Sequence, residues 1–195
     1  MVVYTKTALL LLTAVLFIST NSHAQGLKAG MAAWAKNDFE TAISHLQPLA
    51  DSGNADAQFA IGRMHAVGSG FRKSSLAAIT WLGMAARQGH IPAQTALAKK
   101  YLSGTNGLPQ NFVAAVKWFR KAANHGVAEA QFQLGQLYAE GKGVKRDFVA
   151  AHMWFNLAAA QGHNGAAARR SLVSLKLTRM QISQAQKLAG NWGRK

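Results

Sequence analysis

Residues 130–163 read AQFQLGQLYAEGKGVKRDFVAAHMWFNLAAAQGH. The stretch has two halves of similar length, both rich in alanine, leucine and other residues that favour helices. Gly141 and Gly143 separate the halves, and glycine supplies the positive φ angles that a tight turn between helices needs. Asp147 opens the second half and is a preferred N-cap, because its carboxylate can accept a hydrogen bond from a free amide. The stretch therefore predicts an antiparallel pair of helices.

This helix pair is one copy of a repeat, since the same residues recur upstream at fixed offsets. Each copy has a tryptophan, two alanines four and five residues later, a glycine eight residues later and another alanine four residues beyond it. Counted from Ala57, that last alanine recurs at intervals of 36, 37 and 36 residues. The aligned residues are Trp81, Trp118 and Trp154, with Ala57, Ala93, Ala130 and Ala166. Such a period predicts stacked helix pairs.

Two features of the second helix in each copy support this interpretation. Its first residue is Ser74, Asn111 or Asp147, three different residues that are all preferred N-caps. The tryptophan recurs at one register inside the helix, which we interpret as packing in the core. A platform for a sugar or a cofactor is the alternative interpretation. Trp34 and Trp192 lie outside that register.

The predicted repeats occupy most of the chain. Residues 27–56 look like a degenerate first helix pair with a shortened turn at residues 36–38. Three full repeats are expected to follow it. They are predicted at residues 57–92, 93–129 and 130–165.

The C-terminal residues 166–192 are predicted to form capping helices. Thr178 and Gln181 have the spacing of a capping box, in which each side chain bonds the other residue's backbone amide. The last helix carries three apolar residues on one stripe, which would cover the open end of the stack. These residues are Ile182, Ala185 and Leu188. Residues 25–195 are therefore expected to form a single all-α repeat domain.

Residues 1–24 have the layout of a secretory signal peptide. A positive charge at Lys6 precedes an almost wholly apolar run over residues 8–18, and residues 22–24 form a small-x-small cleavage pattern. The apolar run is too short to span a bilayer, and no later segment of the sequence approaches a transmembrane run. We expect cleavage after residue 24 and a periplasmic or secreted protein. An uncleaved membrane anchor is the alternative.

The chain is strongly basic, with 22 Lys+Arg against 7 Asp+Glu and a formal net charge of +15. The charge is uneven, because residues 58–195 hold 19 basic residues and three acidic ones. Such a surface attracts polyanions through a salt-sensitive field. The export signal makes nucleic acid an unlikely natural partner. Anionic lipid, lipopolysaccharide, a cell-wall polymer or an acidic protein would fit better.

No pattern of catalytic or metal-binding residues stands out. The chain has no cysteine, and its histidines are not paired at the spacing of helical metal ligands. His90 and His163 share one register after the second helix of a pair, so we interpret them as turn residues. The few acidic residues are scattered, which does not favour a site with two carboxylates. We therefore predict no catalytic residue, no metal, no cofactor and no enzymatic activity.

The chain resembles the Sel-one-like repeat (SLR) family, a relative of the tetratricopeptide repeat. The resemblance covers residues 27–176 and departs at Ala98, where glycine is usual, and at His65, where tyrosine is usual. It rests most clearly on Ala130, Leu134, Gly135, Tyr138, Gly141, Gly143, Val144, Asp147, Trp154, Ala158, Ala159 and Gly162. The resemblance implies an α-solenoid, a right-handed superhelix of tandem antiparallel helix pairs.

The resemblance also implies a groove lined by the first helix of each pair. Two registers carry the groove positions of tetratricopeptide repeats. The first register holds Phe59, Thr95 and Phe132. The second register holds Arg63, Lys99 and Gln136. Aromatic platforms with cationic rims would suit an extended acidic ligand, whereas the alternative is that the two phenylalanines are partly buried against neighbouring helices.

The expected function is that of a scaffold or adaptor for protein–protein interaction in the bacterial envelope, with a protein as partner. One alternative is a regulator or inhibitor of a cell-wall-processing enzyme. Another is a basic module that binds an anionic envelope polymer or a lipid surface. That last function would show as an affinity that falls steeply as the salt concentration rises.

Overall fold

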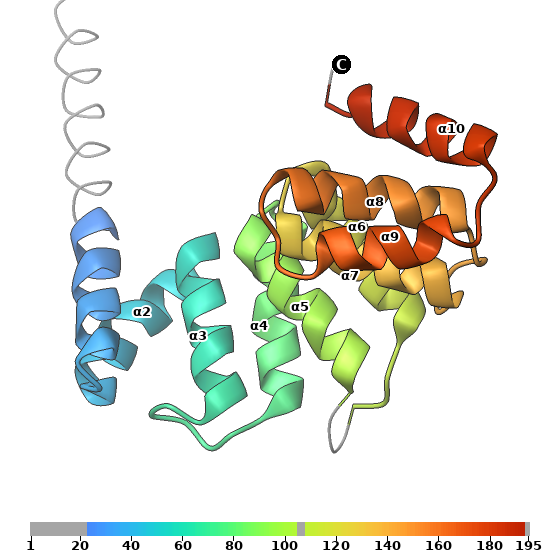
Figure 1. Cartoon of the computed structure of the whole chain (residues 1–195). Coiled ribbons are helices and arrows are strands. Elements are labelled where there is room, and N and C mark those ends of the chain that lie inside the picture. Colours follow the sequence, from blue (N-terminus) through green and yellow to red (C-terminus); the bar gives the residue numbers. More distant parts are fainter. Residues whose placement is uncertain (1–22, 105–107, 194–195) are drawn as a thin grey trace, which may run out of the picture. The chain divides into compact units, whose positions relative to one another are not determined.

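The computed structural model describes residues 23–104 and 108–193 (Figure 1). Helices are the only regular elements of more than one residue in these two stretches, which confirms the all-α prediction. Contacts divide the chain into two compact units, residues 1–85 and residues 86–195. Residues 1–22 of the predicted signal peptide lie outside the described residues. No described helix is both long enough and apolar enough to cross a membrane.

The first unit consists of helices that follow one another along the chain. Residues 23–35 are helical, α2 spans Phe39–Asp51, α3 spans Ala55–Val67 and α4 spans Ser75–Arg87. A short turn at residues 36–38 joins the first two helices, as predicted for a degenerate first pair. The α2 and α3 helices pack against each other. The boundary between the units falls inside α4, after Ala85.

Aliphatic side chains of α2 and α3 form the core of the first unit. Leu46, Ile61 and Met64 are fully buried there. Gly62 on α3 lies so close to α4 that an added Cβ atom would be 3.0 Å from the backbone nitrogen of Leu82. A small residue at this register therefore allows the close approach of the two helices.

The second unit contains six helices described in full. These are α5 (Ile91–Ser103), α6 (Phe112–Asn124), α7 (Ala128–Glu140), α8 (Phe148–Ala160), α9 (Ala166–Ser174) and α10 (Arg179–Gly190). From α5 to α9 each helix packs against the next one along the chain, and α10 packs against α8. Helices that stack in sequence order form an α-solenoid, so the predicted fold class is confirmed.

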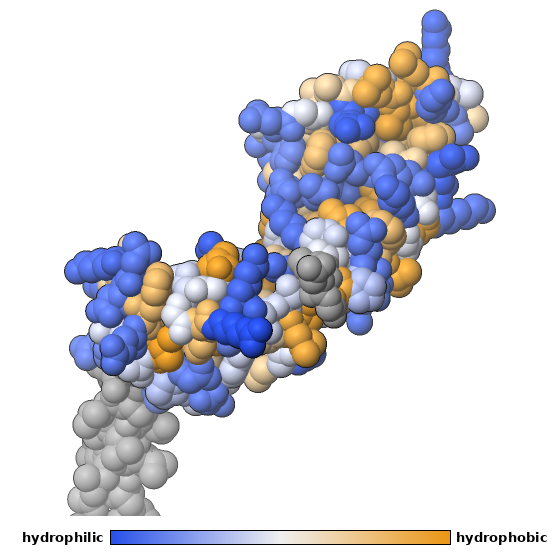
Figure 2. Space-filling model, turned by 90° about the horizontal axis from the view of Figure 1, so that it is seen from below, coloured by the Kyte–Doolittle hydropathy of each residue, from blue (hydrophilic) through white to orange (hydrophobic). Residues whose placement is uncertain are grey.

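Hydrophobic side chains also reach the surface of the molecule. Figure 2 shows small groups of them between hydrophilic side chains on the face that it draws. The α6 residue Val113 is 68% exposed, and Met180 at the start of α10 is 80% exposed. Single exposed apolar residues are common in folded proteins and do not by themselves mark a binding site.

The three predicted N-caps of the second helices are confirmed. The side chains of Ser74, Asn111 and Asp147 each accept a hydrogen bond from the backbone N–H three residues later. The distances are 3.1, 2.9 and 3.0 Å, respectively. Hydroxyl, amide and carboxylate thus perform one task, because each has an oxygen within reach of a free amide at the helix start.

The first helix of each pair begins two residues before the alanine that marks the repeat. The starting residues of α3, α5 and α7 are Ala55, Ile91 and Ala128. Asn54 caps α3 by accepting a bond from the N–H of Ala57 at 2.9 Å. His90 caps α5 through Nδ1, which accepts a bond from the N–H of Ala93 at 3.1 Å. His90 is therefore a turn residue, as its register predicted, and it also has a capping role.

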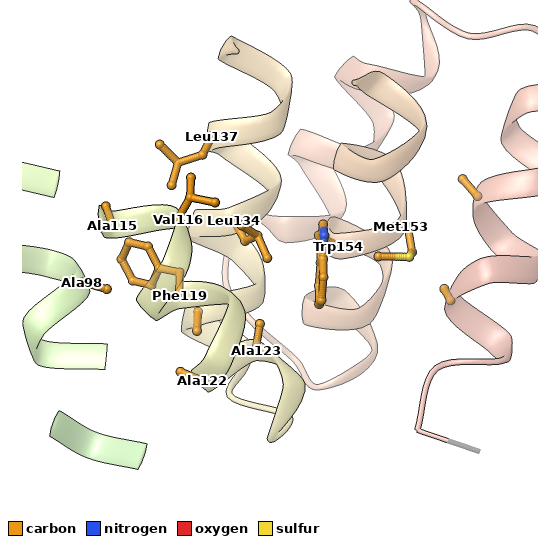
Figure 3. Packing of buried hydrophobic residues seen from close by; sticks show 13 residues of the cluster. Ala98, Ala115, Val116, Phe119, Ala122, Ala123, Leu134, Leu137, Met153 and Trp154 are labelled. Carbon is orange, nitrogen blue, oxygen red and sulfur yellow. The ribbon is translucent and has the colours of Figure 1, made fainter. Parts of the chain in front are cut away.

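The main core of the second unit lies between α5, α6 and α7 and continues toward α8 and α10 (Figure 3). Phe119 of α6 is fully buried, and its ring lies beside Ala98 of α5 (Figure 3). Ala98 replaces the usual glycine of this register, and it is itself fully buried. The departure from the family pattern is thus accommodated inside the core.

The recurring tryptophans pack in the core to different degrees. Trp154 is 4% exposed and belongs to the main core of the second unit. Trp118 packs against the same core, and Trp81 packs against the core of the first unit, but both are only half-buried. The prediction that these tryptophans pack in the core is therefore confirmed for Trp154. Trp81 and Trp118 each contact a core but stay partly exposed.

The capping box of the last helix forms as predicted, but the prediction of which residues on this helix face the core is partly wrong. Thr178 and Gln181 make both bonds of the capping box. Leu188 is 45% exposed, whereas Ala185 and Ala189 are buried in the main core. Trp192 packs against the same core as these two alanines. Its ring contacts the ring of Trp154 edge-on, with 4.6 Å between the ring centroids. At about 100° per residue, Leu188 lies just outside the stripe that faces α8.

A ladder of buried glutamines joins consecutive helix pairs, and the sequence analysis missed it. Each glutamine donates its side-chain N–H to a backbone carbonyl eight residues earlier, at the end of the preceding helix. The three pairs are Gln58 with Ala50, Gln94 with Ala86 and Gln131 with Ala123. The last carbonyls of a helix have no partner within the helix, so these bonds satisfy otherwise orphaned acceptors.

Replacement of Gln131 by methionine is expected to lower the free energy of unfolding by about 1–3 kcal/mol. The variant keeps the length of the side chain but leaves the carbonyl of Ala123 without its donor. It also removes the Oε1 acceptor of Gln161, whose Nε2 lies 2.7 Å away. Urea denaturation measures the change, and Gln186→Met on the exposed side of α10 is the control. Equal stability of both variants would show that the ladder contributes nothing.

Candidate functional site

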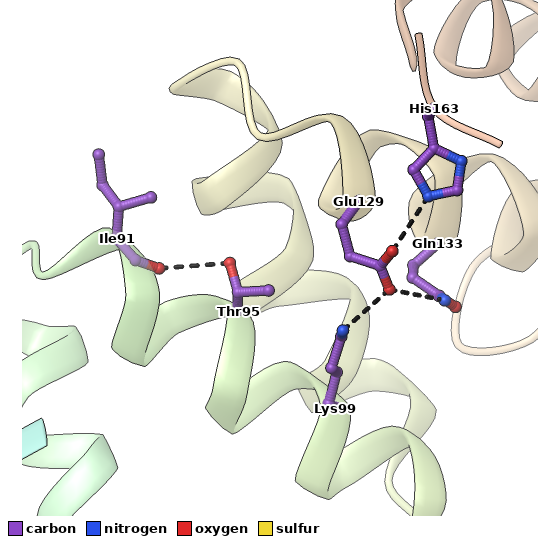
Figure 4. Close-up of polar contacts among 6 residues, drawn as sticks. All are labelled: Ile91, Thr95, Lys99, Glu129, Gln133 and His163. Atoms are coloured by element: carbon purple, nitrogen blue, oxygen red, sulfur yellow. Dashed lines mark hydrogen bonds and ion pairs between the residues drawn. The ribbon is translucent and has the colours of Figure 1, made fainter. Parts of the chain in front are cut away.

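The predicted groove residues of the second unit lie on α5 and α7. Thr95 and Lys99 are one turn apart on α5 (Figure 4). The Thr95 hydroxyl donates to the carbonyl of Ile91 at 3.3 Å, so it is engaged within its own helix. Gln136 on α7 lines a small pocket of about 250 Å³ together with Gln133. The structure thus brings these residues to neighbouring helices, although not all of them are free to bind a ligand.

Glu129 is the centre of a polar network that joins α5, α7 and the residues after α8 (Figure 4). Its carboxylate lies 3.0 Å from the Lys99 ammonium and 3.0 Å from Nε2 of His163. Gln133 donates to the same carboxylate at 3.2 Å. Lys99 was predicted to line a groove, and its side chain is 53% exposed. It is also half of an ion pair, so it has a structural role as well.

The network strongly favours the ionised form of Glu129. Partial burial of the carboxyl alone would raise its pKa. Hydrogen bonds from His163, Lys99 and Gln133 outweigh that effect and hold the pKa of Glu129 at about 2. The carboxylate therefore stays charged at any physiological pH and continues to hold the two helices together.

Replacement of Glu129 by glutamine should make the stability of the protein less dependent on pH in acid. A depressed pKa contributes stability above the unfolded value near 4.5, and this contribution is lost as the pH falls toward 2. The difference between the two proteins should be constant above about pH 6 and shrink below pH 4.5. Solvent screening of this half-exposed group limits the difference to about 1 kcal/mol.

Urea denaturation of both proteins between pH 2.5 and 7 measures this difference. Titrating groups that do not contact Glu129 cancel in the comparison, including His65 and His152, whose pKa values are lowered by burial. A difference that does not change with pH would show that Glu129 is not held ionised by its neighbours.

Phe132 is half-buried rather than displayed in an open groove. Its ring stacks on the imidazole of His163 at 4.3 Å and lies 5.6 Å from the ring of Phe155, measured between centroids. The alternative considered for this residue, partial burial against adjacent helices, is therefore correct. His163 touches both Phe132 and Glu129, so this turn residue has a role in packing as well.

The first unit presents a different arrangement at its predicted groove residues. The guanidinium of Arg63 lies over the ring of Trp34, 5.2 Å from its centroid, and 5.8 Å from the centroid of Phe59. Arg63 is exposed, while the two aromatic rings are half-buried. Trp34 could not be assigned from the sequence, because it lies outside the repeat register. The result is an exposed cation held against two aromatic faces.

These arrangements are suited to binding a polar or charged ligand. An exposed guanidinium on an aromatic platform can pair with a carboxylate, and the amides of Gln133 and Gln136 can bond a peptide backbone. Among the described residues, no group of three or more histidine and acidic side chains could hold a metal ion. Helix pairs with such surfaces define a helical repeat protein of the tetratricopeptide-like class.

The Sel1 repeat profile matches three consecutive segments, residues 55–90, 91–127 and 128–163. The chain therefore belongs to the Sel1 repeat family, the family of the Sel-one-like repeats. Proteins of this family act as scaffolds for protein interaction. The search of curated proteins gave no match.

Solved structures of the family are similar to this chain. A Sel1 repeat protein from Oxalobacter formigenes has 36% sequence identity over 73% of this chain, with a TM-score of 0.68. A protective antigen of uropathogenic Escherichia coli with an SLR fold has 28% identity over 80% of this chain, with a TM-score of 0.50. The matches cover 58% and 41% of those two proteins, so this chain spans only part of their length.

Proposed function

We propose that this protein is an exported scaffold of the bacterial envelope, without enzymatic activity, that holds a protein partner on the first helices of its repeats. The three Sel1 repeats carry the proposal, because the family serves as scaffolds for protein interaction. The exposed cations Arg63 and Lys99 support it, since they lie on α3 and α5 where a partner's carboxylates could pair with them. Each residue belongs to a different unit, so each can be tested alone.

The envelope location rests on the sequence of residues 1–24. Their charged start, apolar run and small-x-small end are typical of a cleaved signal peptide. One similar protein is a protective antigen of uropathogenic Escherichia coli, and an exported location for the present chain would be consistent with that similarity.

The location is tested by expression of the full chain in a Gram-negative host, followed by fractionation and N-terminal sequencing. We expect the protein in the periplasmic fraction or the medium, with Gln25 as its first residue. Recovery of the uncleaved chain in the cytoplasm would contradict export and leave the binding proposal to be tested separately.

The partner surface is tested by in-cell crosslinking and identification of the captured proteins. We expect Arg63→Glu or Lys99→Glu to reduce recovery of the partner roughly tenfold, because each reversal replaces an attraction with a repulsion. Lys187→Glu on α10 is the control, since it makes the same charge change at an exposed position. Thermal melting of each variant checks the fold, because Lys99 also pairs with Glu129. Unchanged recovery by both variants would contradict the proposed surface.

A further inference from the structure

A pocket of about 610 Å³ lies in the second unit, beside the turn between α7 and α8. Its walls come from α6, α7, this turn, the start of α8, the residues before α10 and α10 itself. The volume is within the range of ligand sites in proteins. The pocket is separate from the Glu129 network, with which it shares no residue.

The lining of this pocket is strongly cationic. Its charged residues are Arg120, Lys145, Arg146, Lys176 and Asp147. Asp147 is the only acid among them, and its carboxylate already accepts a hydrogen bond from the N–H of Ala150 as the N-cap of α8. Within the described part of the chain, none of the four cations forms an ion pair. Four unpaired cations that face one hollow create a field that attracts an anion.

Two of these cations are held in place by aromatic rings. The Arg120 guanidinium donates a hydrogen bond of 2.7 Å to the Tyr138 hydroxyl and lies 5.9 Å from the centroid of its ring. The Arg146 guanidinium lies over the ring of Phe148, 5.6 Å from the centroid. A guanidinium that is already positioned loses less conformational entropy when it binds a carboxylate.

The pocket continues into a second hollow along α6. This second hollow has a volume of about 400 Å³ and shares Arg120 and Val144 with the first one. It adds the cations Lys117 and Lys121, and the exposed Val113 forms part of its wall. We call the two hollows together the basic trough. Apolar side chains line it between the cations, notably Val144, Val149 and Leu177.

We propose that the basic trough binds an extended acidic segment of a protein, in which aliphatic residues alternate with glutamate or aspartate. The spread of six cations over two joined hollows favours an extended ligand over a single small anion. The apolar residues between the cations favour a chain that carries aliphatic side chains as well as carboxylates. A concave surface is less suited to a flat lipid bilayer. This site adds a second binding surface to the proposed scaffold and does not depend on Arg63 or Lys99.

The test uses the full mature chain and a fluorescein-labelled peptide of alternating glutamate and leucine. Fluorescence anisotropy measures binding to the wild type, to Arg120→Gln/Arg146→Gln and to Arg179→Gln/Lys187→Gln, which loses the same charge on α10. We expect the first double variant to bind roughly tenfold more weakly or worse, because two charge-assisted contacts are lost. The control double variant should bind like the wild type. Thermal melting confirms that all three proteins are folded.

Three further probes separate the possible ligands. A peptide of alternating glutamate and glycine should bind more weakly than the glutamate–leucine peptide. Inorganic phosphate should compete poorly with the peptide. Vesicles with anionic lipid should bind no better to the wild type than to Arg120→Gln/Arg146→Gln. Equal losses in both double variants would overturn the proposal, because binding would then follow net charge alone. If vesicles bound more tightly to the wild type than to Arg120→Gln/Arg146→Gln, the basic trough would be a binding site for a membrane surface instead. Failure of the peptide to bind would also overturn it, whereas the crosslinking result for Arg63 and Lys99 would be unaffected.

Discussion

Replacement of Phe119 by alanine is expected to lower the free energy of unfolding by about 3–5 kcal/mol. The side chain is fully buried in the main core of the second unit, beside Ala98. Removal of the ring leaves a cavity between α5 and α6, which can close only if whole helices move. Since domains are stable by about 5–15 kcal/mol, this loss would remove a large share of the total stability. Urea denaturation followed by circular dichroism measures the change.

Val113→Ala is the matched control for this prediction. Val113 lies six residues before Phe119 on the same helix but is 68% exposed. Its replacement should change stability by about 0.5 kcal/mol or less. Similar effects of the two substitutions would mean that α6 does not pack in the core as described.

The second large effect is expected at Gly143, in the turn between α7 and α8. Its φ of +71° is one that residues with a side chain rarely adopt. A Cβ atom there would collide with the backbone of Phe112 and lie 2.7 Å from the nitrogen of Val113. Neither backbone atom can move away without shifting the start of α6. We expect Gly143→Ala to cost about 3 kcal/mol or more, as measured by urea denaturation.

The variant Gly126→Ala is the control that separates the steric clash of an added Cβ atom from the strain of a positive φ angle. Gly126 also has a positive φ, +81°, but an added Cβ would meet nothing within 4 Å. This variant should show only the cost of a left-handed alanine, about 1–2 kcal/mol. If Gly143→Ala cost no more than Gly126→Ala, the turn of one repeat would not touch the helix of the preceding repeat.

The sequence predicted the fold well because its strongest signals are local and repeated. Ser74, Asn111 and Asp147 differ in type but share the ability to cap a helix, so the starts of three helices could be located from them. The three copies also fixed which residues belong to the helices and which to the turns. A cap needs only a partner three residues away, and such a spacing can be read directly from the chain.

The candidate sites were less predictable because their contacts join residues that are distant in sequence. Glu129 meets His163 across 34 positions, and Arg120 meets Tyr138 across 18. No spacing rule connects such pairs, although the scarcity of acidic residues after residue 57 could have drawn attention to Glu129. The resemblance placed Lys99 in a groove, but it could not reveal the ion pair that engages its charge.

The pattern of hydrophobic residues also cannot show which of two adjacent apolar residues faces the core. Leu188 and Ala189 are adjacent, and hydrophobicity alone favours the leucine for the core. The structure buries the alanine because α10 approaches α8 closely, and Trp192 fills the remaining space against Trp154. The glutamine ladder was within reach, since Gln58, Gln94 and Gln131 recur with the repeat. Their burial was unexpected because glutamine is usually exposed.

The central claim is that within the second unit each helix pair packs directly on the next, so that the turn of one repeat meets the helix of another. A nuclear Overhauser spectrum of the isotope-labelled repeat domain, residues 25–195, tests it most directly, through the α-protons of Gly143 and the amide proton of Val113. The close approach of Gly143 to the start of α6 predicts a strong cross-peak between them. Absence of that cross-peak in a folded, assigned protein would contradict the stacking of consecutive repeats.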